Sequence, residues 1–181
     1  MKTKGKTLVT ALSVALAFGL GAAHDVDADP GTDTSPAAIA VTGDFDGDGK
    51  TDIAVFRPST GEWFIINSAT STLTVKQWGA LRDQPVLGDF DGDGKTDIAV
   101  YRPSTGEWFI INSATATVTV RQWGLSGTDV PVPGDFDGDG KTDIAAYRPS
   151  TGVWYIINSA DGTVTTQQWG APDDQPIPEF F

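Results

Sequence analysis

The sequence predicts an all-β protein built from three near-identical repeats, and three observations support this expectation. The repeated units begin at Gly43, Gly88 and Gly134, which are 45 and 46 residues apart. Each unit contains short runs of β-branched and aromatic residues separated by turn residues. Beyond the N-terminal segment, no stretch has the 3.6-residue periodicity of an amphipathic helix.

The first unit predicts four strands. The runs Asp52–Arg57 and Trp63–Asn67 are separated by Pro58-Ser-Thr-Gly61, in which proline suits the first corner of a turn and glycine its left-handed position. The runs Thr72–Trp78 and Pro85–Leu87 follow. Four strands in a period near 45 residues are typical of a β-propeller blade, and the alternative of a helical pair conflicts with the residue types.

Two tryptophans recur in every unit. We expect them to pack between neighbouring blades rather than to form platforms that stack on sugars. The strand Trp63–Ile66 is apolar on both faces, as expected for a sheet covered on each side. The tryptophans are Trp63, Trp78, Trp108, Trp123, Trp154 and Trp169.

The predicted blades occupy residues 39–87, 88–133 and 134–181, the last ending in a truncated lead-in strand of a fourth unit. Three blades are fewer than the four to eight that usually close a propeller. We therefore expect an incomplete, open arc of three four-stranded blades. Its open edges invite self-association, or the chain is a fragment of a longer propeller.

Residues 1–28 have the order of a secretory signal peptide: three lysines, an uncharged apolar run, then small residues. Cleavage is expected after Ala23 or Ala28, with residues 29–38 as a flexible linker. A membrane anchor is the alternative, but the run is short and no cationic stop follows it. The predicted location is extracellular or on the cell surface.

The charge balance excludes some partners. Lys and Arg total 12 and Asp and Glu total 24, which gives a net charge of -12. A nucleic-acid partner needs clustered cations, and an anionic membrane surface would repel this chain. The chain has no cysteine, so disulfides and thiol chemistry are excluded.

An acidic nonapeptide recurs once per unit, with aspartates at loop positions 1, 3, 5 and 9 and glycine at position 6. Ca²⁺ takes six to eight oxygen ligands, and alternate side chains of a tight loop converge to supply them. We expect about three Ca²⁺ ions, one per repeat, with the lysine at position 7 contributing its main-chain carbonyl. The predicted ligands are Asp44, Asp46, Asp48, Lys50 and Asp52; Asp89, Asp91, Asp93, Lys95 and Asp97; and Asp135, Asp137, Asp139, Lys141 and Asp143.

The loops share the spacing of their first ligands with EF-hands but lack the position-12 ligand of an EF-hand. An EF-hand needs a bidentate glutamate at position 12, which is Val55, Val100 or Ala146 here. A solvated Asp/Gly-rich turn without metal is the alternative, which the threefold repetition disfavours. Mg²⁺ resists so complete a protein cage, and Zn²⁺ lacks its usual ligands.

The segment Asp44-Phe-Asp-Gly-Asp-Gly-Lys-Thr-Asp-Ile-Ala-Val-Phe-Arg-Pro-Ser-Thr-Gly-Glu-Trp and its two copies resemble FG-GAP/VCBS-type repeats, known from integrin α chains and secreted bacterial proteins. The resemblance implies a calcium-binding β-propeller with the loop aspartates and position-7 carbonyls as ligands. It implies more loosely a role in adhesion or carbohydrate binding.

We expect a secreted binding or adhesion module for an extracellular protein or glycan. The alternatives are an enzyme acting on extracellular polysaccharide, an accessory domain of one, or a structural surface or matrix component. We predict no catalytic and no cofactor-binding residues, because His24 is the only histidine and no serine has a partner base. Glu62 and Glu107 are expected to be solvated residues at strand starts rather than an acid/base pair.

Arginine stands before proline at the end of one strand in each unit, at Arg57, Arg102 and Arg148. We expect these side chains to hydrogen-bond a neighbouring blade or a loop carboxylate, with a shared anion or sugar site as the alternative. Arg82, Asp83, Asp129 and Asp161 lie outside the repeated pattern, and we expect them to be surface loop variation.

Overall fold

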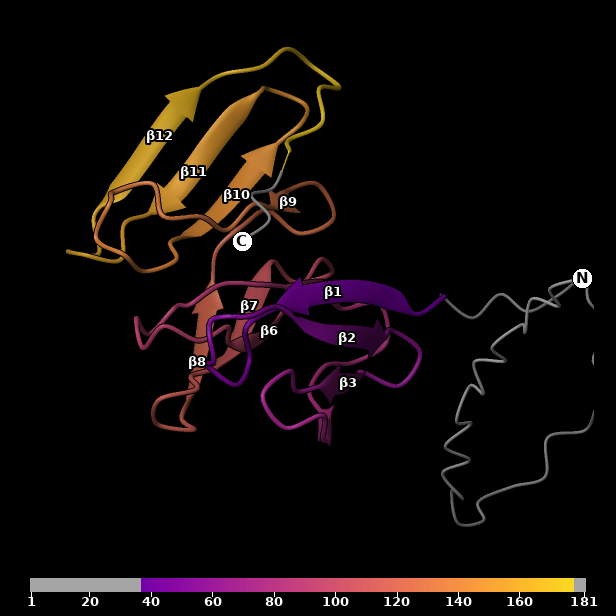
Figure 1. Cartoon of the computed structure of the whole chain (residues 1–181). Coiled ribbons are helices and arrows are strands. Elements are labelled where there is room, and N and C mark those ends of the chain that lie inside the picture. Colours follow the sequence, from indigo (N-terminus) through magenta and orange to yellow (C-terminus); the bar gives the residue numbers. More distant parts are fainter. Residues whose placement is uncertain (1–36, 178–181) are drawn as a thin grey trace, which may run out of the picture. The chain divides into compact units, whose positions relative to one another are not determined.

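The computed structural model describes residues 37–177, which form twelve strands and no helix within that range (Figure 1). The expected signal peptide and all but the last two residues of the expected linker lie outside the described residues. The end of the predicted fourth lead-in strand, from residue 178 onward, also lies outside them.

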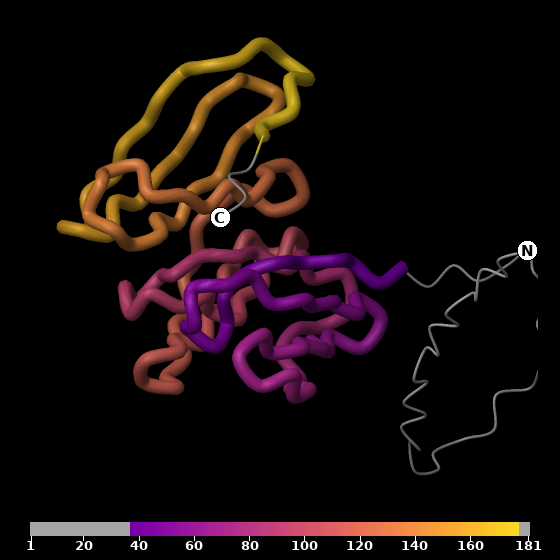
Figure 2. The backbone as a smooth tube through the Cα atoms, in the orientation of Figure 1, coloured from indigo at the N-terminus to yellow at the C-terminus, as the bar shows by residue number. Residues whose placement is uncertain are grey.

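The strands form three antiparallel sheets of four. Each sheet is made from one contiguous stretch of chain, whose course the colours of Figure 2 follow from indigo to yellow. This confirms the all-β class and the four-stranded blades, and the described residues form no closed barrel. The first sheet contains β1 (Ile39–Gly43), β2 (Asp52–Arg57), β3 (Glu62–Ile66) and β4 (Leu73–Gln77). The second contains β5 (Gln84–Val86), β6 (Ile98–Arg102), β7 (Glu107–Ile111) and β8 (Val118–Gln122). The third contains β9 (Val130–Pro131), β10 (Ile144–Arg148), β11 (Val153–Ile157) and β12 (Val164–Gln168).

Each sheet begins with the strand that precedes its acidic loop. In the first sheet β1 pairs with β2, so that Gly43 faces Asp52 across the base of the loop. In the third sheet the same closure is the bridge between Gly134 and Asp143. The sheets therefore begin at residues 39, 84 and 130, and the second and third start earlier than the expected repeat units at 88 and 134.

Neighbouring sheets pack face to face. The indoles of Trp63 and Trp108 are completely buried. The core of the first sheet includes Val100 of β6, with Ile98 and Phe109 packed against it. The core of the second sheet similarly has Ile144 of β10 packed against it. Packing between blades, the expected role of the tryptophans, is thus confirmed for these two interfaces.

Burial on both faces is not uniform, which differs from the expectation for Trp63–Ile66. In β3, Trp63 and Ile65 are buried, Phe64 is half-buried and Ile66 is exposed. Strand β2 alternates strictly between buried and exposed residues, whereas the middle three residues of β6 and of β10 are all buried. Position explains the contrast between β2 and β6, because no described sheet precedes the first one. It does not explain the half-buried Phe64 of β3, because the equivalent Phe109 of β7 is also half-buried.

The first strands of the three sheets face a common space. A cavity of about 290 Å³ is lined by Ile39–Thr42 of the first sheet, Gln84–Leu87 of the second, and Val130, Pro131 and Pro133 of the third. Innermost strands arranged around one axis are the arrangement of propeller blades. The described residues therefore form open, propeller-like blades.

Candidate metal centre

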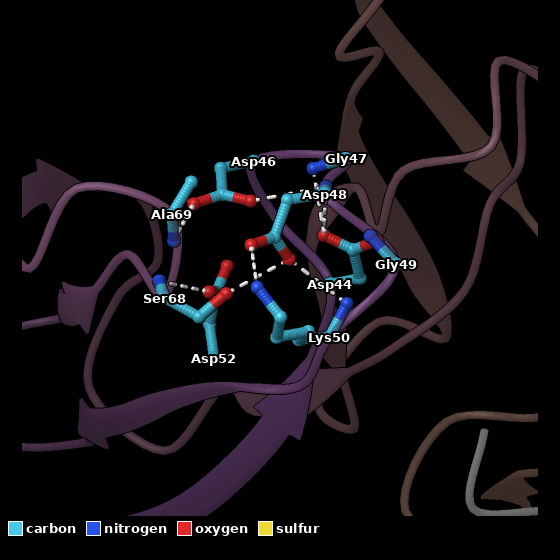
Figure 3. A network of polar contacts seen from close by, with 9 residues as sticks. All are labelled: Asp44, Asp46, Gly47, Asp48, Gly49, Lys50, Asp52, Ser68 and Ala69. Atoms are coloured by element: carbon cyan, nitrogen blue, oxygen red, sulfur yellow. Dashed lines mark hydrogen bonds and ion pairs between the residues drawn. The ribbon is translucent and has the colours of Figure 1, made fainter.

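The aspartate at position 1 organises the backbone of each acidic loop, as Figure 3 shows for the first loop. In the first loop, Asp44 Oδ1 accepts the backbone N–H of Gly47 at 2.6 Å, and its Oδ2 accepts that of Gly49 at 2.8 Å. Both glycines have φ of 81°, a conformation that side chains other than glycine rarely adopt. The loop therefore winds around its first carboxylate.

The aspartate at position 9 ties the loop to the sheet. Asp52 is buried, and its oxygens accept the backbone N–H of Phe45 at 2.8 Å and of Ser68 at 2.6 Å. The same two bonds are made by Asp97 and Asp143 in the other loops. These carboxylates connect the loop with the turn between the third and fourth strands of its sheet.

That turn supplies contacts that the sequence reasoning missed. Ser68 Oγ donates to Asp48 Oδ1 at 2.9 Å, and the backbone N–H of Ala69 donates to Asp46 Oδ2 at 3.1 Å (Figure 3). The equivalent serine and alanine do the same in the other two loops. The tripeptide Asn-Ser-Ala, repeated without change in all three units, was the sequence signal that could have indicated these contacts.

Three of the four aspartates of each loop come together. One carboxylate oxygen from each lies within 4.8 Å of the others in three clusters. The first cluster uses positions 1, 3 and 5, whereas the second and third use positions 1, 3 and 9. The main-chain carbonyls of Lys50, Lys95 and Lys141 stay predicted ligands. The clusters are Asp44, Asp46 and Asp48; Asp89, Asp91 and Asp97; and Asp135, Asp137 and Asp143.

The first loop differs from the others because its lysine turns back onto it. The Nζ atom of Lys50 lies 3.0 Å from Asp48 Oδ2, although most of the side chain is exposed (Figure 3). This hydrogen bond lowers the pKa of Asp48 and raises that of Lys50. An ammonium group thus contacts the acidic cluster at a point where positive charge is favourable.

The clusters fit a hard divalent cation. Their members offer oxygen ligands alone, which suits Ca²⁺ or Mg²⁺ and not Zn²⁺. Within residues 37–177, the Oδ1 atom of Asp91 is buried and has no hydrogen-bond partner. Burial also raises the pKa of Asp97 in the same cluster. A buried orphan oxygen beside a desolvated carboxylate is the arrangement that a bound cation would satisfy.

The three loops lie next to one another. The backbone N–H of Thr96 donates to the carbonyl of Asp44 at 2.6 Å, and that of Thr142 donates to the carbonyl of Asp89 at 2.8 Å. Residues of all three loops line a cavity of about 370 Å³. Each acidic loop is therefore part of the contact between neighbouring sheets, so the order of one loop affects the next.

The expected structural role of the arginines is seen at two of the three positions. Arg102 donates from Nε and Nη2 to the two oxygens of Asp83, both at 2.9 Å. Arg148 makes the same bidentate pair with Asp129, at 2.8 and 2.9 Å. The pairs raise the pKa of both guanidinium groups.

The expectation that Asp83 and Asp129 are surface variation is wrong. Both are buried, at 2% and 6% exposure, and each also accepts the backbone N–H at the start of its own loop. The loops Gly79–Gln84 and Gly124–Val130 differ in length by one residue, which hid the equivalence of the two aspartates in the sequence.

The chain matches the family model described as FG-GAP-like repeat over residues 44–100 and 89–146. These matches span more than half of the chain, and the chain belongs to the FG-GAP-like repeat family. No curated protein and no solved structure matches it. Fold, loops and family together define a β-propeller-like repeat protein with three acidic clusters suited to metal ions. Within residues 37–177, no helix is long and apolar enough to cross a membrane.

Proposed function

We propose that this protein is a secreted calcium-binding β-propeller repeat module that uses Ca²⁺ structurally and binds an extracellular protein or glycan. The observation that carries the proposal is the acidic cluster formed three times at equivalent places. A single acidic turn is common on protein surfaces. Three copies, each held by the same hydrogen bonds from the same turn, indicate a built site.

The bound ion would neutralise carboxylates that otherwise repel one another, with Ca²⁺ preferred for its tolerance of many oxygen ligands. The chain itself provides the frame. Asp44 and Asp52 fix the loop backbone, and Ser68 holds Asp48 in place. The role of the bound ion is structural, because these loops also form contacts between neighbouring sheets.

Two equivalent pockets support the ligand-binding part of the proposal. Each has a volume of about 280 Å³ and contains a tryptophan, an arginine and a second aromatic ring from the next sheet. In one, the Arg102 guanidinium carbon lies 4.3 Å from the ring centre of Phe109. In the other, Arg148 lies 4.5 Å from the ring centre of Tyr155. Repeated weak sites gain avidity when a ligand engages several together.

Secretion rests on the N-terminal sequence. Three lysines, an uncharged apolar run and small residues have the order of an exported leader. Export also suits calcium loops of this kind, because extracellular modules commonly bind at about 10⁻⁴–10⁻³ M. Microscopy or fractionation of cells that produce the full chain tests this part of the proposal.

Calcium titration of the purified chain tests the metal sites. We expect calorimetric uptake of about three ions and a lower melting temperature after chelation, since the folded state alone binds the ion. Asp89→Asn should remove one site. Glu107→Gln is the control and should bind as the unaltered chain does, because Glu107 faces Arg102 at the end of the β6–β7 pair that lies away from Asp97, and among the described residues its carboxylate accepts only the Thr105 hydroxyl. Absence of calcium uptake by the folded, unaltered chain would overturn the proposal.

A glycan array probed with and without chelator tests ligand binding. Specific binding that depends on calcium supports a module whose folded surface recognises sugars. Turnover of an arrayed polysaccharide would favour the enzyme alternative instead. Binding to neither glycans nor extracellular matrix proteins would leave the structural surface component as the better description.

A further inference from the structure

Two pockets between neighbouring sheets are built from equivalent residues on both walls. One wall is the glutamine that ends the fourth strand of a sheet, with the tryptophan and glycine that follow it. The other wall is the arginine that ends the second strand of the next sheet, with an aromatic residue of its third strand. We call them the Phe109 pocket and the Tyr155 pocket after that aromatic residue.

The two walls of each pocket are joined by a hydrogen bond from the tryptophan. Trp78 Nε1 donates to the carbonyl of Phe109 at 3.0 Å, and Trp123 Nε1 donates to the carbonyl of Tyr155 at 2.9 Å. Both indoles are half-buried, so each ring is part of the wall while its N–H is already used. The two pockets therefore have matching walls that are held by matching bonds.

The arginine of each pocket has its charge neutralised within its own sheet. Arg102 donates from Nε and Nη2 to Asp83, and Arg148 donates from the same two atoms to Asp129. In both residues Nη1 is the nitrogen that is left over from this bidentate pair. The arginine side chains are 30% and 24% exposed and line the pockets, so a ligand there can reach the guanidinium.

The aromatic residue beside the guanidinium decides how Nη1 is used. Arg148 Nη1 donates to the Tyr155 hydroxyl at 3.0 Å, and the proton of that hydroxyl has no acceptor within residues 37–177. Phe109 has no hydroxyl, and over the same residues Arg102 Nη1 has no acceptor. Each pocket thus offers one unused donor, which is an N–H of Arg102 in the first and the O–H of Tyr155 in the second.

The glutamine of each pocket supplies an acceptor. Gln77 Nε2 donates to the carbonyl of Thr60 at 2.8 Å, and Gln122 Nε2 donates to that of Thr105 at 2.8 Å. Because the amide nitrogen is used in this way, the amide oxygen is the free end of the side chain, and no described residue donates to it. Much of the remaining lining is aromatic or aliphatic.

A donor, an acceptor and an apolar wall without net charge match the chemistry of a neutral sugar. Sugar hydroxyls both donate and accept hydrogen bonds, and the C–H groups of the ring pack on apolar surface. An anionic ligand would meet a guanidinium that is already neutralised, on a chain with a net charge of -12. A volume of about 280 Å³ is at the small end for ligand sites, which suits a single ring.

We propose that each pocket binds one ring of a neutral glycan through the glutamine amide oxygen and the unused donor. Phe109 and Tyr155 are then the residues that determine specificity, because they decide whether the sugar meets a guanidinium N–H or a phenolic O–H. This inference rests on the proposed function and names the class of ligand that the binding module takes.

Heteronuclear NMR of the calcium-loaded full chain tests the inference, because each pocket contains one tryptophan whose indole N–H reports on it. The probes are hexasaccharides of glucose, mannose, galactose, xylose and N-acetylglucosamine, with a galacturonic acid hexasaccharide as the acidic comparison. We expect at least one neutral probe to shift the indole signals of Trp78 and Trp123. The indole of Trp154 lies outside both pockets and is the internal control.

Two substitutions test the specificity residues one pocket at a time. Phe109→Tyr should give the Phe109 pocket, followed at Trp78, the order of sugar affinities of the Tyr155 pocket. Tyr155→Phe should do the reverse at Trp123. One hydrogen bond is exchanged in each case, so we expect the Kd for at least one sugar to change by roughly three- to tenfold. The unaltered pocket of each variant is its matched control and should keep its affinities.

Calcium uptake is measured on the same samples, which separates the two proposals. A folded chain that takes up no calcium contradicts the proposed function. Uptake of calcium with no indole shift from any neutral probe overturns the sugar sites alone. Tighter binding of the galacturonic acid probe, shifts produced only by a collagen-derived peptide, or identical affinities before and after both substitutions would also overturn this inference.

Discussion

Tyr101 is a buried side chain whose hydroxyl lacks a hydrogen-bond partner within residues 37–177. A Cβ on Gly124 would lie 2.7 Å from this hydroxyl, so the hydroxyl packs closely against the Gly124 main chain. The first sheet has Phe56 at the equivalent position. Phe56 and Tyr101 differ only by this hydroxyl, so the second sheet buries a polar group that the first sheet lacks.

Tyr101→Phe should therefore stabilise the fold. Removing an unsatisfied buried hydroxyl raises the free energy of unfolding by about 1 kcal/mol. Tyr155→Phe is the control, since the Tyr155 hydroxyl accepts a hydrogen bond from Arg148 at 3.0 Å and its loss should not stabilise. Denaturant midpoints of the two variants measure the difference, and a lower midpoint for Tyr101→Phe would contradict this interpretation.

Because of the same buried hydroxyl, we expect the free energy of unfolding to fall at alkaline pH. Burial, with a smaller contribution from the charge of Asp129, raises the pKa of Tyr101 above its ordinary value of 10.0. Above pH 10 the unfolded chain thus loses this proton more readily than the folded one, and stability falls as pH rises. Melting curves between neutral pH and pH 11 should show a smaller alkaline decrease for Tyr101→Phe than for the unaltered chain.

Lys50 predicts a difference between the calcium loops. Its ammonium group contacts Asp48, so a bound cation would have to compete with it. Lys50→Ala should raise the affinity of the first loop by about two- to fivefold, as expected for an exposed charge pair. Lys141→Ala is the control, because that lysine makes no ion pair among the described residues. Equal calorimetric effects of the two substitutions would refute the difference.

At the scale of the element, the hairpin between β6 and β7 depends on a close backbone approach. Gly106 has φ of 73°, and a Cβ there would overlap the carbonyl oxygen of Gly124. The backbone N–H of Trp123 also donates to the Gly106 carbonyl at 2.9 Å. The hairpin turn and the segment after β8 therefore pack directly on each other.

Gly106→Ala should destabilise the protein more than backbone strain alone. Gly127→Ala is a matched control, with φ of 74° but no atom within 4 Å of the added Cβ. We expect a cost of about 1 kcal/mol for the control and at least twice that for Gly106→Ala. Thermal or chemical unfolding measures both, and equal costs would show that the close approach has no role.

At the scale of the whole molecule, the acidic loops and the sheet interfaces act together. Three divalent ions would halve the net charge of -12, which lessens repulsion within the chain. Because neighbouring loops are hydrogen-bonded, an ion in one loop also steadies the contact with the next. Calcium should therefore favour the order of several sheets at once.

Local patterns in the sequence were sufficient to predict the repeats, the strands and the acidic loops. The strand expected at Asp52–Arg57 is β2, and the run Thr72–Trp78 contains β4. These features are decided by alternation and turn chemistry over a few residues, and repetition shows them three times. The acidic clusters follow the same logic, because ligand spacing within nine residues is also local.

Only the tertiary structure decided which equivalent residues behave alike. Val55 and Val100 have the same sequence surroundings, yet one is exposed and the other buried, because burial depends on a neighbouring sheet. The pair of Arg102 with Asp83 and the bond from Ser68 to Asp48 join residues 19 and 20 positions apart. Such contacts depend on register and packing between elements, which residue type and local spacing do not determine.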